Sequence, residues 1–468
     1  MKLLKYILFV LSISILITSC KLGPKYERPE INSPEKFRYS TSDDSIKNVE
    51  WWTMFNDKDL DTIVEYALDS SLDVLTMASR VEQARYVIGY TKADALPTFG
   101  VQAGVGTGNF ANGSALGSET NNFNAGVSLS WELDFWGKYR SLNEAAKANY
   151  LATEYGMREL QISVITEVVS SYFLLLDYRA RLKVSEKTLQ LREEYLDIIN
   201  QKYSGGVVAE IDLNQAQMQK AIAAASVPLY KRLVAKAEHS LSILIGKNPG
   251  TIISNNNLIE TLIPEDIPNG LPSELLVRRP DILQSEMMLK AQNAQIGAAI
   301  AMRFPSISLS GFLGGASNDL SAFTANGLAW NAGANLLGPI FNFGKNKRRV
   351  DIEREKTKQA LYKYNKVVLQ AFREVEDALV NIETYEDEIK ARKMHFEAAD
   401  NAQTLSKQRY DQGVTSYLEV LESQRQAFDA ELNLYKTKKE YLDSYIKLYK
   451  AIGGGWISEE EKNQAEAE

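Results

Sequence analysis

Two periodicities of hydrophobic residues alternate along the chain. Residues 99–105 alternate apolar residues with Gly and Gln, and a similar period-two pattern returns in residues 127–135, 307–313 and 330–336. Alternation of apolar with small or polar residues is typical of a β-strand that has one apolar face. The sequence therefore predicts four strands, at about residues 98–108, 125–135, 305–316 and 328–341.

Polar segments rich in Gly, Asn and Ser separate the strands of each pair, at residues 109–122 and 318–327. Trp131, Trp136 and Trp330 lie in or beside the strands. Long polar loops with aromatic residues near the strand ends are typical of an outer-membrane β-barrel. The alternation alone also fits a soluble β-hairpin packed on helices.

A long tract without proline follows each pair of strands. In the first tract a hydrophobic residue returns every seven positions, at Val168, Leu175, Leu182, Leu189, Leu196 and Tyr203. This heptad pattern indicates helices packed as coiled coils, and one helix from Tyr139 to Ser204 would be about 100 Å long. Positions four residues further on are polar, so we expect a wall one helix thick with water on both faces.

The chain consists of two similar halves. Residues 201–207 (QKYSGGV) resemble residues 408–414 (QRYDQGV), and this spacing of 207 positions, within one residue, also relates Gly137 to Gly344 and Pro97 to Pro305. Self-similarity in a preserved order indicates an internal duplication. We predict a first structural repeat at residues 60–270 and a second at 271–456, with an extended segment at 20–59 and an acidic tail at 457–468.

Four strands per chain cannot close a membrane barrel, because the smallest known barrels have eight. An open sheet edge in lipid would leave unpaired amides that cost several kcal/mol each. Either the strands stay outside the membrane or several copies share one barrel. Three copies would give twelve strands above a helical tube, with polar residues such as Gln102, Ser128 and Glu132 facing a water-filled bore, but two or four copies also satisfy this argument.

The N-terminus reads as a signal and an anchor. Residues 6–17 form an apolar run after Lys2 and Lys5, too short for a membrane span, so we predict a signal peptide at residues 1–19. The run ends in Ile17-Thr18-Ser19-Cys20, which resembles the bacterial lipobox. That resemblance implies diacylglycerol and N-acyl lipid on Cys20, the single cysteine of the chain. The alternative is an ordinary signal peptide with an incidental cysteine.

Composition excludes several classes of function. The net charge of −7 argues against nucleic acid as a partner, since phosphate binding needs clustered Lys and Arg. One cysteine and two histidines, His239 and His395, exclude a disulfide framework and make a Cys/His metal site or a histidine-based catalytic set improbable. We predict that the chain is not an enzyme and needs no cofactor.

Several short motifs, in a fixed order, carry a family resemblance. They are residues 20–29 (CKLGPKYERP), Trp51-Trp52 with Phe55-Asn56-Asp57, Arg278-Arg279-Pro280-Asp281, residues 294–297 (AQIG) and residues 304–307 (FPSI). At these residues the chain resembles the TolC-type outer membrane efflux family, in its NodT-like lipoprotein branch, over about residues 20–456. We assign Arg278 to Asp281 no chemistry, because Pro followed by Asp is a common helix start.

The resemblance implies an α+β membrane protein in the outer membrane. It implies a homotrimer in which four strands per chain form a twelve-stranded β-barrel, continuous with a long periplasmic α-helical barrel. It also implies docking to a periplasmic adaptor (membrane fusion) protein and to an inner-membrane pump, often of the resistance-nodulation-division type. The predicted function is the outer-membrane channel of a tripartite efflux system that exports small molecules by passive conduction. A conduit for type I polypeptide secretion is the alternative, and a lipid-anchored coiled coil without a pore is a third hypothesis.

The repeated Tyr-x-x-Gly sites mark the ends of the long helices. Gly206 and Gly413 allow the chain to reverse. In the family such turns form the closed periplasmic tip, so the resemblance places adaptor contacts at these glycines and at Val207 and Val414.

The resemblance also places a gate beside these turns. The acids of the family's aperture fall on Asp212, Glu419 and Glu422, its tyrosine falls on Tyr410, and its arginine falls on Thr415. Any closing ion pair that used this arginine is therefore missing or replaced. Like charges gathered around one axis would repel, favour cations or raise the carboxylate pKa. The alternative is that these residues are solvated acids at helix starts.

Overall fold

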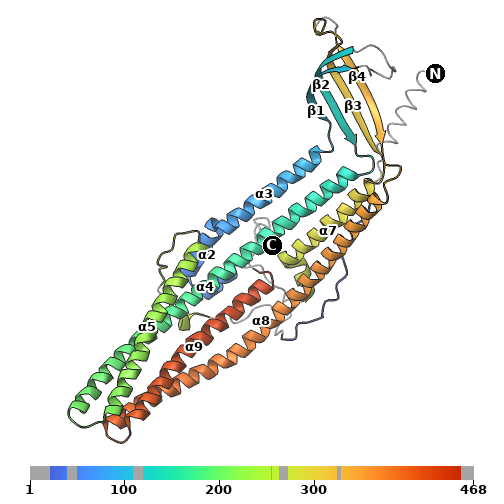
Figure 1. Cartoon of the computed structure of the whole chain (residues 1–468). Coiled ribbons are helices and arrows are strands. Elements are labelled where there is room, and N and C mark those ends of the chain that lie inside the picture. Colours follow the sequence, from blue (N-terminus) through green and yellow to red (C-terminus); the bar gives the residue numbers. More distant parts are fainter. Residues whose placement is uncertain are drawn as a thin grey trace. The chain divides into compact units, whose positions relative to one another are not determined.

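The computed structural model describes residues 22–39, 50–108, 120–254, 256–262, 272–323 and 328–454. The predicted signal peptide, Cys20 and the acidic tail lie outside the described residues, as do residues 109–119 of the first polar loop and residues 324–327 of the second. The elements follow nearly the same order twice along the chain (Figure 1). The first half contains η1 (Trp51–Phe55), α2 (Lys58–Ser70), α3 (Leu72–Ala93), β1 (Thr98–Gly108), β2 (Thr120–Leu133), α4 (Lys138–Ser204), α5 (Glu210–Leu244) and η2 (Leu258–Glu260). The second contains α6 (Pro272–Arg278), α7 (Pro280–Ala301), β3 (Ser306–Ser317), β4 (Ala329–Leu337), α8 (Lys345–Asp411) and α9 (Tyr417–Ala451).

The four strands form one antiparallel sheet in the order β1-β2-β3-β4. Val101, Val127, Leu313 and Trp330 are paired in one row across it, which gives the sheet an apolar face. Ser130 and Ser310 are paired in a row on the other face. The alternating apolar residues of the sequence therefore lie on one face that all four strands share.

The ends of two strands differ from the prediction. β2 already begins at Thr120, within a segment predicted to be a loop, and β4 ends at Leu337 rather than near residue 341. Pro339 accounts for the early end of β4, because proline has no N–H for the ladder of hydrogen bonds.

The chain divides into two compact units, and each unit draws on both halves of the sequence. Unit 1 comprises Met1–Ile31, Arg80–Glu154 and Gln284–Lys366, which include the sheet. Unit 2 comprises Asn32–Ser79, Tyr155–Leu283 and Val367–Glu468. The long helices α4 and α8 contribute to both units.

An aromatic cluster forms much of the core of unit 2. The ring of Trp51 stacks on Tyr449 with centroids 5.2 Å apart, and Phe55 meets Phe173 edge-on at 4.9 Å. Trp51 and Phe173 are fully buried, as are α4 residues on several sides of the helix: Val168, Val169, Tyr172 and Leu175. The prediction of a wall one helix thick is therefore wrong for this part of α4, because residues 51–55 pack on it.

The heptad seam of α4 also changes along the helix. Val168 and Leu175 are fully buried, as predicted, but Leu182, Leu189 and Leu196 are only half-buried. Further along, the buried positions seven residues apart are Ser185, Arg192 and Ile199. A search for hydrophobic residues misses this second seam because two of its three members are polar.

Candidate functional site

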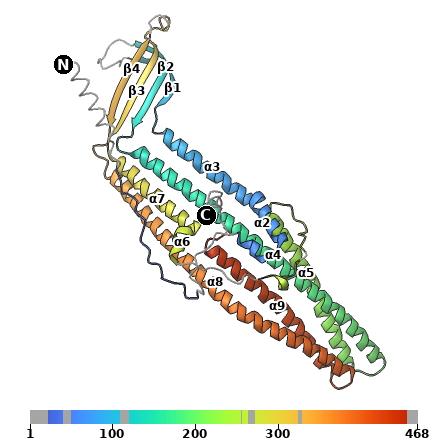
Figure 2. The same cartoon turned by 180° about the vertical axis from the view of Figure 1, so that it is seen from behind.

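The two helix turns lie side by side at one end of unit 2 (Figures 1 and 2). Gly206 and Gly413 adopt the left-handed conformation, with φ of 71° and 75°. The N–H of Val207 donates to the Lys202 carbonyl at 2.9 Å, and the N–H of Val414 donates to the Arg409 carbonyl at 2.9 Å. This is the Schellman pattern that ends a helix at glycine. The same turn is therefore built twice, as the sequence predicted.

An apolar cluster holds the two turns together. Its buried members come from α4, α5 and α9: Tyr195, Ile199, Ala216, Tyr417, Val420 and Leu421. Tyr410 packs against this cluster, with its ring 5.5 Å from that of Tyr417. The hydroxyl of Tyr410 is buried and has no hydrogen-bond partner in the described part of the chain.

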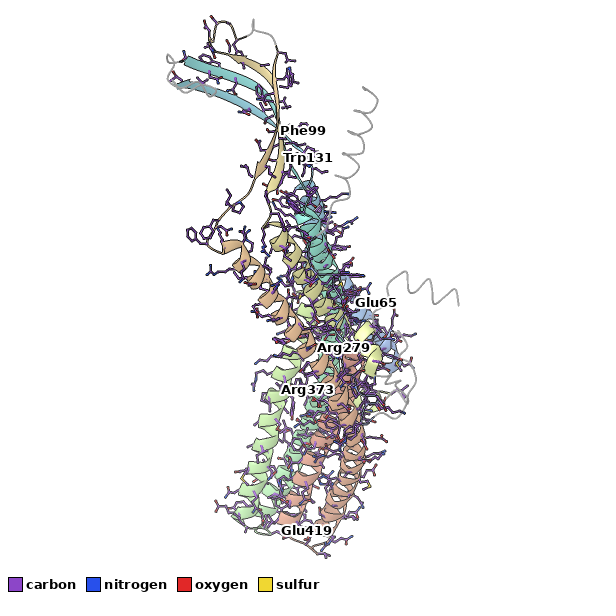
Figure 3. All side chains as sticks on the ribbon, turned by 90° about the vertical axis from the view of Figure 1, so that its right-hand side faces the viewer. Glu65, Phe99, Trp131, Arg279, Arg373 and Glu419 are labelled. Carbon is purple, nitrogen blue, oxygen red and sulfur yellow. The ribbon has the colours of Figure 1, made fainter. Side chains whose placement is uncertain are left out.

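Glu419 is bound within its own hairpin. Arg409 Nη1 lies 2.9 Å from its Oε1, and the hydroxyl of Thr415 donates to its Oε2. Glu419 is labelled in Figure 3, at the turn end of unit 2. Thr415 occupies the position where the resemblance expects an arginine, and Arg409, six residues earlier, supplies the positive charge. The sequence analysis missed Arg409, although its place in the repeat matches that of Lys202.

The corresponding acid of the first hairpin is less constrained. Asp212 lies at the position equivalent to Glu419, but Lys202 does not pair with it: the ammonium lies 4.3 Å from the centroid of the Tyr410 ring. Asp212 is half-buried and its carboxylate has no hydrogen-bond or ion-pair partner among the residues that the structure describes. Among the described residues, therefore, no cationic side chain pairs with Asp212.

Glu422 stands apart from the other two acids. Arg425 binds both of its carboxylate oxygens, at 2.6 Å and 3.0 Å, and Gln426 donates a third hydrogen bond. These hydrogen bonds, with that from Arg425 the strongest, lower the pKa of Glu422 to about 2. Glu422 is thus charged but locally neutralised on an exposed surface.

Arg279 forms a structural ion cluster that the sequence analysis did not foresee. Its guanidinium is buried and binds Asp281 through two nitrogens, at 3.0 Å and 2.7 Å. It also binds Glu374 at 2.8 Å and the carbonyl of Ala451 at 2.7 Å. The predicted helix start at Pro280 is present, and Arg279, labelled in Figure 3, joins it to α8 and to the end of α9.

The segment that follows Cys20 is fixed along α7 in unit 1. Arg28 lies 2.9 Å from one carboxylate oxygen of Glu286, and the hydroxyl of Tyr26 donates to the other at 3.3 Å. A Cβ on Gly297 would lie only 2.8 Å from the carbonyl of Leu22, so glycine is required for this approach. These contacts explain two of the motifs noted in the sequence, residues 20–29 and 294–297.

In the described residues, no three His, Cys, Asp or Glu side chains gather in a way that could hold a metal ion.

Known proteins resemble this chain over nearly its whole length. The outer membrane efflux protein family matches residues 63–247 and 271–454. The cation efflux system protein CusC of Escherichia coli (strain K12) is 32% identical over 460 residues, which cover 95% of this chain and 98% of CusC. The toluene efflux pump outer membrane protein TtgI of Pseudomonas putida is 33% identical over 457 residues, covering 94% of this chain and 97% of TtgI.

Solved structures agree with the fold. The outer-membrane channel OprN superposes with a TM-score of 0.86 at 29% identity, covering 93% of this chain and all of that one. The Campylobacter jejuni outer membrane channel CmeC has a TM-score of 0.86 at 28% identity, covering 96% of this chain and 98% of CmeC.

These similarities confirm the predicted fold class, function and location. The chain has the sheet and long helices of these outer-membrane channels. It is an outer-membrane channel of an efflux system rather than an enzyme. The chain belongs to the outer membrane efflux protein family.

Proposed function

We propose that three copies of this chain close a twelve-stranded barrel joined to a helical tube, as the exit duct of a tripartite efflux system. The observation that carries this proposal is the sheet: β1 and β4 are both edge strands, and the sheet has a continuous apolar face. Open edges cannot persist in lipid, and four strands are too few to close on themselves. Purified protein in lipid bilayers should conduct ions and run as a trimer, and a non-conducting monomer would overturn the proposal.

The partners we propose are a periplasmic adaptor and an inner-membrane pump of the resistance-nodulation-division type. The names of the relatives support export of small molecules, since CusC is named for cations and TtgI for toluene. A deletion strain should accumulate the exported compound, and re-expression of the chain should restore its export. Loss of a secreted polypeptide instead would favour the alternative, type I secretion.

An apolar patch at the turns supports the adaptor contact. Val207 is 73% exposed and Val414 is 63% exposed, and Ile211 and Leu418, at equivalent positions of the two hairpins, are exposed beside them. Exposed apolar patches on a folded chain mark sites of protein contact. We therefore propose that the adaptor covers these four residues in each copy.

Lipidation at Cys20 has a direct test. Cys20→Ser should abolish incorporation of radiolabelled palmitate and should leave the precursor unprocessed, because the thiol is the acceptor of the diacylglyceryl group. Ser19→Ala is the matched control and should keep the label, since a small residue remains before the cysteine. Equal labelling of both variants would show that Cys20 is incidental.

We propose that Asp212 is the principal acid of the gate. Glu419 is paired with Arg409 and Glu422 with Arg425, whereas Asp212 is unpaired within the described chain. Three such carboxylates around one axis would attract cations and repel one another. Asp212→Ala should therefore reduce the preference of the channel for cations several-fold in single-channel recordings.

Two further variants separate the acids. The double change Asp212→Ala with Glu419→Ala should widen the opening or lower cation preference further, because the hairpin of Glu419 would also lose its ion pair. Glu422→Ala is the control and should leave conductance and selectivity unchanged. A gate that responds equally to all three acids, or to none, would contradict this assignment.

A further inference from the structure

The sheet repeats its own register of hydrogen bonds. Thr98 is opposite Ser130 in the β1–β2 pair, and Ser306 is opposite Leu337 in the β3–β4 pair. Ser306 follows Thr98 by 208 positions, and Leu337 follows Ser130 by 207. This is, within one residue, the spacing that relates the two glycine turns. The duplication is therefore present in the structure as well as in the sequence. Contacts in one repeat can be compared with those at equivalent positions in the other.

In unit 2, a helix of the first repeat packs on a helix of the second. Ser170 on α4 donates a hydrogen bond to Asp443 on α9, with 2.9 Å between the oxygens. Asp443 also accepts from Lys439, one turn earlier on α9. In the other repeat, the helix equivalent to α4 is α8, and the helix equivalent to α9 is α5.

In the described part of one chain, the equivalent surface of α8 has an exposed apolar residue. Leu369 on α8 is 69% exposed, whereas Ile162, at the equivalent position of α4, is 3% exposed. Arg232 and Lys236 on α5 occupy the positions of Lys439 and Asp443. They are exposed, and neither has an ion-pair or hydrogen-bond partner for its side chain among the described residues.

We propose that neighbouring copies dock by repeating this junction, with α8 of one copy against α5 of the next and Asp377 paired with Lys236. The proposal rests on the trimer proposed above. Asp377 takes the position of Ser170, and Lys236 takes that of Asp443. The charges are complementary, because the acid of α9 is replaced by a base on α5 while the serine of α4 is replaced by an acid on α8. Among the described residues of its own copy, Asp377 makes one ion pair, an exposed contact of 3.7 Å with Arg373.

Unit 1 supports the same arrangement independently. Trp136 in the first repeat stacks on Phe304 with centroids 4.6 Å apart, and its Nε1 donates to the carbonyl of Pro305 at 2.7 Å. The equivalent residue, Phe343, is 81% exposed. The residue of the first repeat that is equivalent to Phe304 is Leu96, which is exposed and precedes Pro97, just before β1. Phe343 of one copy therefore docks on Leu96 and Pro97 of the next.

Cysteine cross-linking of the full-length, membrane-purified protein tests the inference. Asp377→Cys with Lys236→Cys, treated with a short bifunctional maleimide, should give covalent dimers and trimers on a denaturing gel. Ser170→Cys with Asp443→Cys is the matched control, because these residues already touch within one chain and should link without an increase in chain number. Asp377→Cys with Lys231→Cys should not link, since Lys231 is directed to Glu186 of its own copy.

The outcomes separate this inference from the proposed function. Trimers in native electrophoresis that fail to cross-link through Asp377 and Lys236 would overturn the docking arrangement while the trimer stands. Monomers in native electrophoresis would overturn both. Charge reversal gives a second readout: Asp377→Lys should lower the temperature at which the trimer dissociates, and Lys236→Asp added to it should restore that temperature. Failure of the second change to restore it would contradict the ion pair.

Discussion

Replacing Arg279 with alanine should destabilise the protein by about 3 kcal/mol, because breaking a buried ion pair leaves its partners uncompensated. The carboxylates of Asp281 and Glu374 would then lose their shared cation, and the carbonyl of Ala451 would lose its donor. Urea titration of the detergent-solubilised protein, followed by circular dichroism, measures the loss.

Arg354→Ala is the control for this experiment. Arg354 is exposed and lies 3.6 Å from Asp351 one turn away, so its removal should cost at most about 0.5 kcal/mol. Arg279→Lys keeps a charge without the four hydrogen bonds and should fall between the two. Equal losses in Arg279→Ala and Arg354→Ala would show that the buried cluster does not stabilise the fold.

Truncating Trp51 to alanine should cost about 3–5 kcal/mol, the range for a large aromatic residue removed from a core. Trp51 is fully buried and contacts Trp52, Phe55 and Tyr449. The same titration should therefore show a large decrease in the free energy of unfolding.

Trp51→Phe separates packing from hydrogen bonding. Its indole Nε1 is buried and makes no hydrogen bond in the described residues, so phenylalanine removes an unpaired donor while it keeps an aromatic ring. We expect this variant to lose far less stability than Trp51→Ala, because an unsatisfied donor stabilises nothing. A loss as large as that of the alanine variant would contradict this expectation.

Features governed by local pattern were predictable from the sequence. Alternation located the four strands, and Gly206 and Gly413 marked the two turns because only glycine adopts a positive φ without strain. The heptad pattern gave the span of α4 to within one residue at its start. Each of these signals lies within a few neighbouring positions of the chain.

Features governed by distant partners were not predictable. Arg279 and Glu374 are 95 positions apart, and no local spacing brings them together. Arg192 lies on the second seam of α4, where its side chain donates to Gln424 of α9, so a polar residue occupies a position that the pattern assigns to an apolar one. Burial removes the Arg192 guanidinium from water and thereby lowers its pKa. The role of Arg409 was hidden for the same reason, because its partner Glu419 comes from the following helix.

The charged contacts at the turns differ in what they connect. Arg409 and Glu419 belong to one hairpin, so a rigid-body movement of that hairpin would leave their ion pair intact. Lys202 and Tyr410 belong to different hairpins, so separating the hairpins must break their contact. Both residues are half-buried, and a cation–π contact contributes from about 0.5–1 kcal/mol at an exposed site to about 2 kcal/mol when it is desolvated. This contact therefore adds little to the work of the proposed opening, and a partner protein that binds the hairpins could supply that work from a small part of its binding energy.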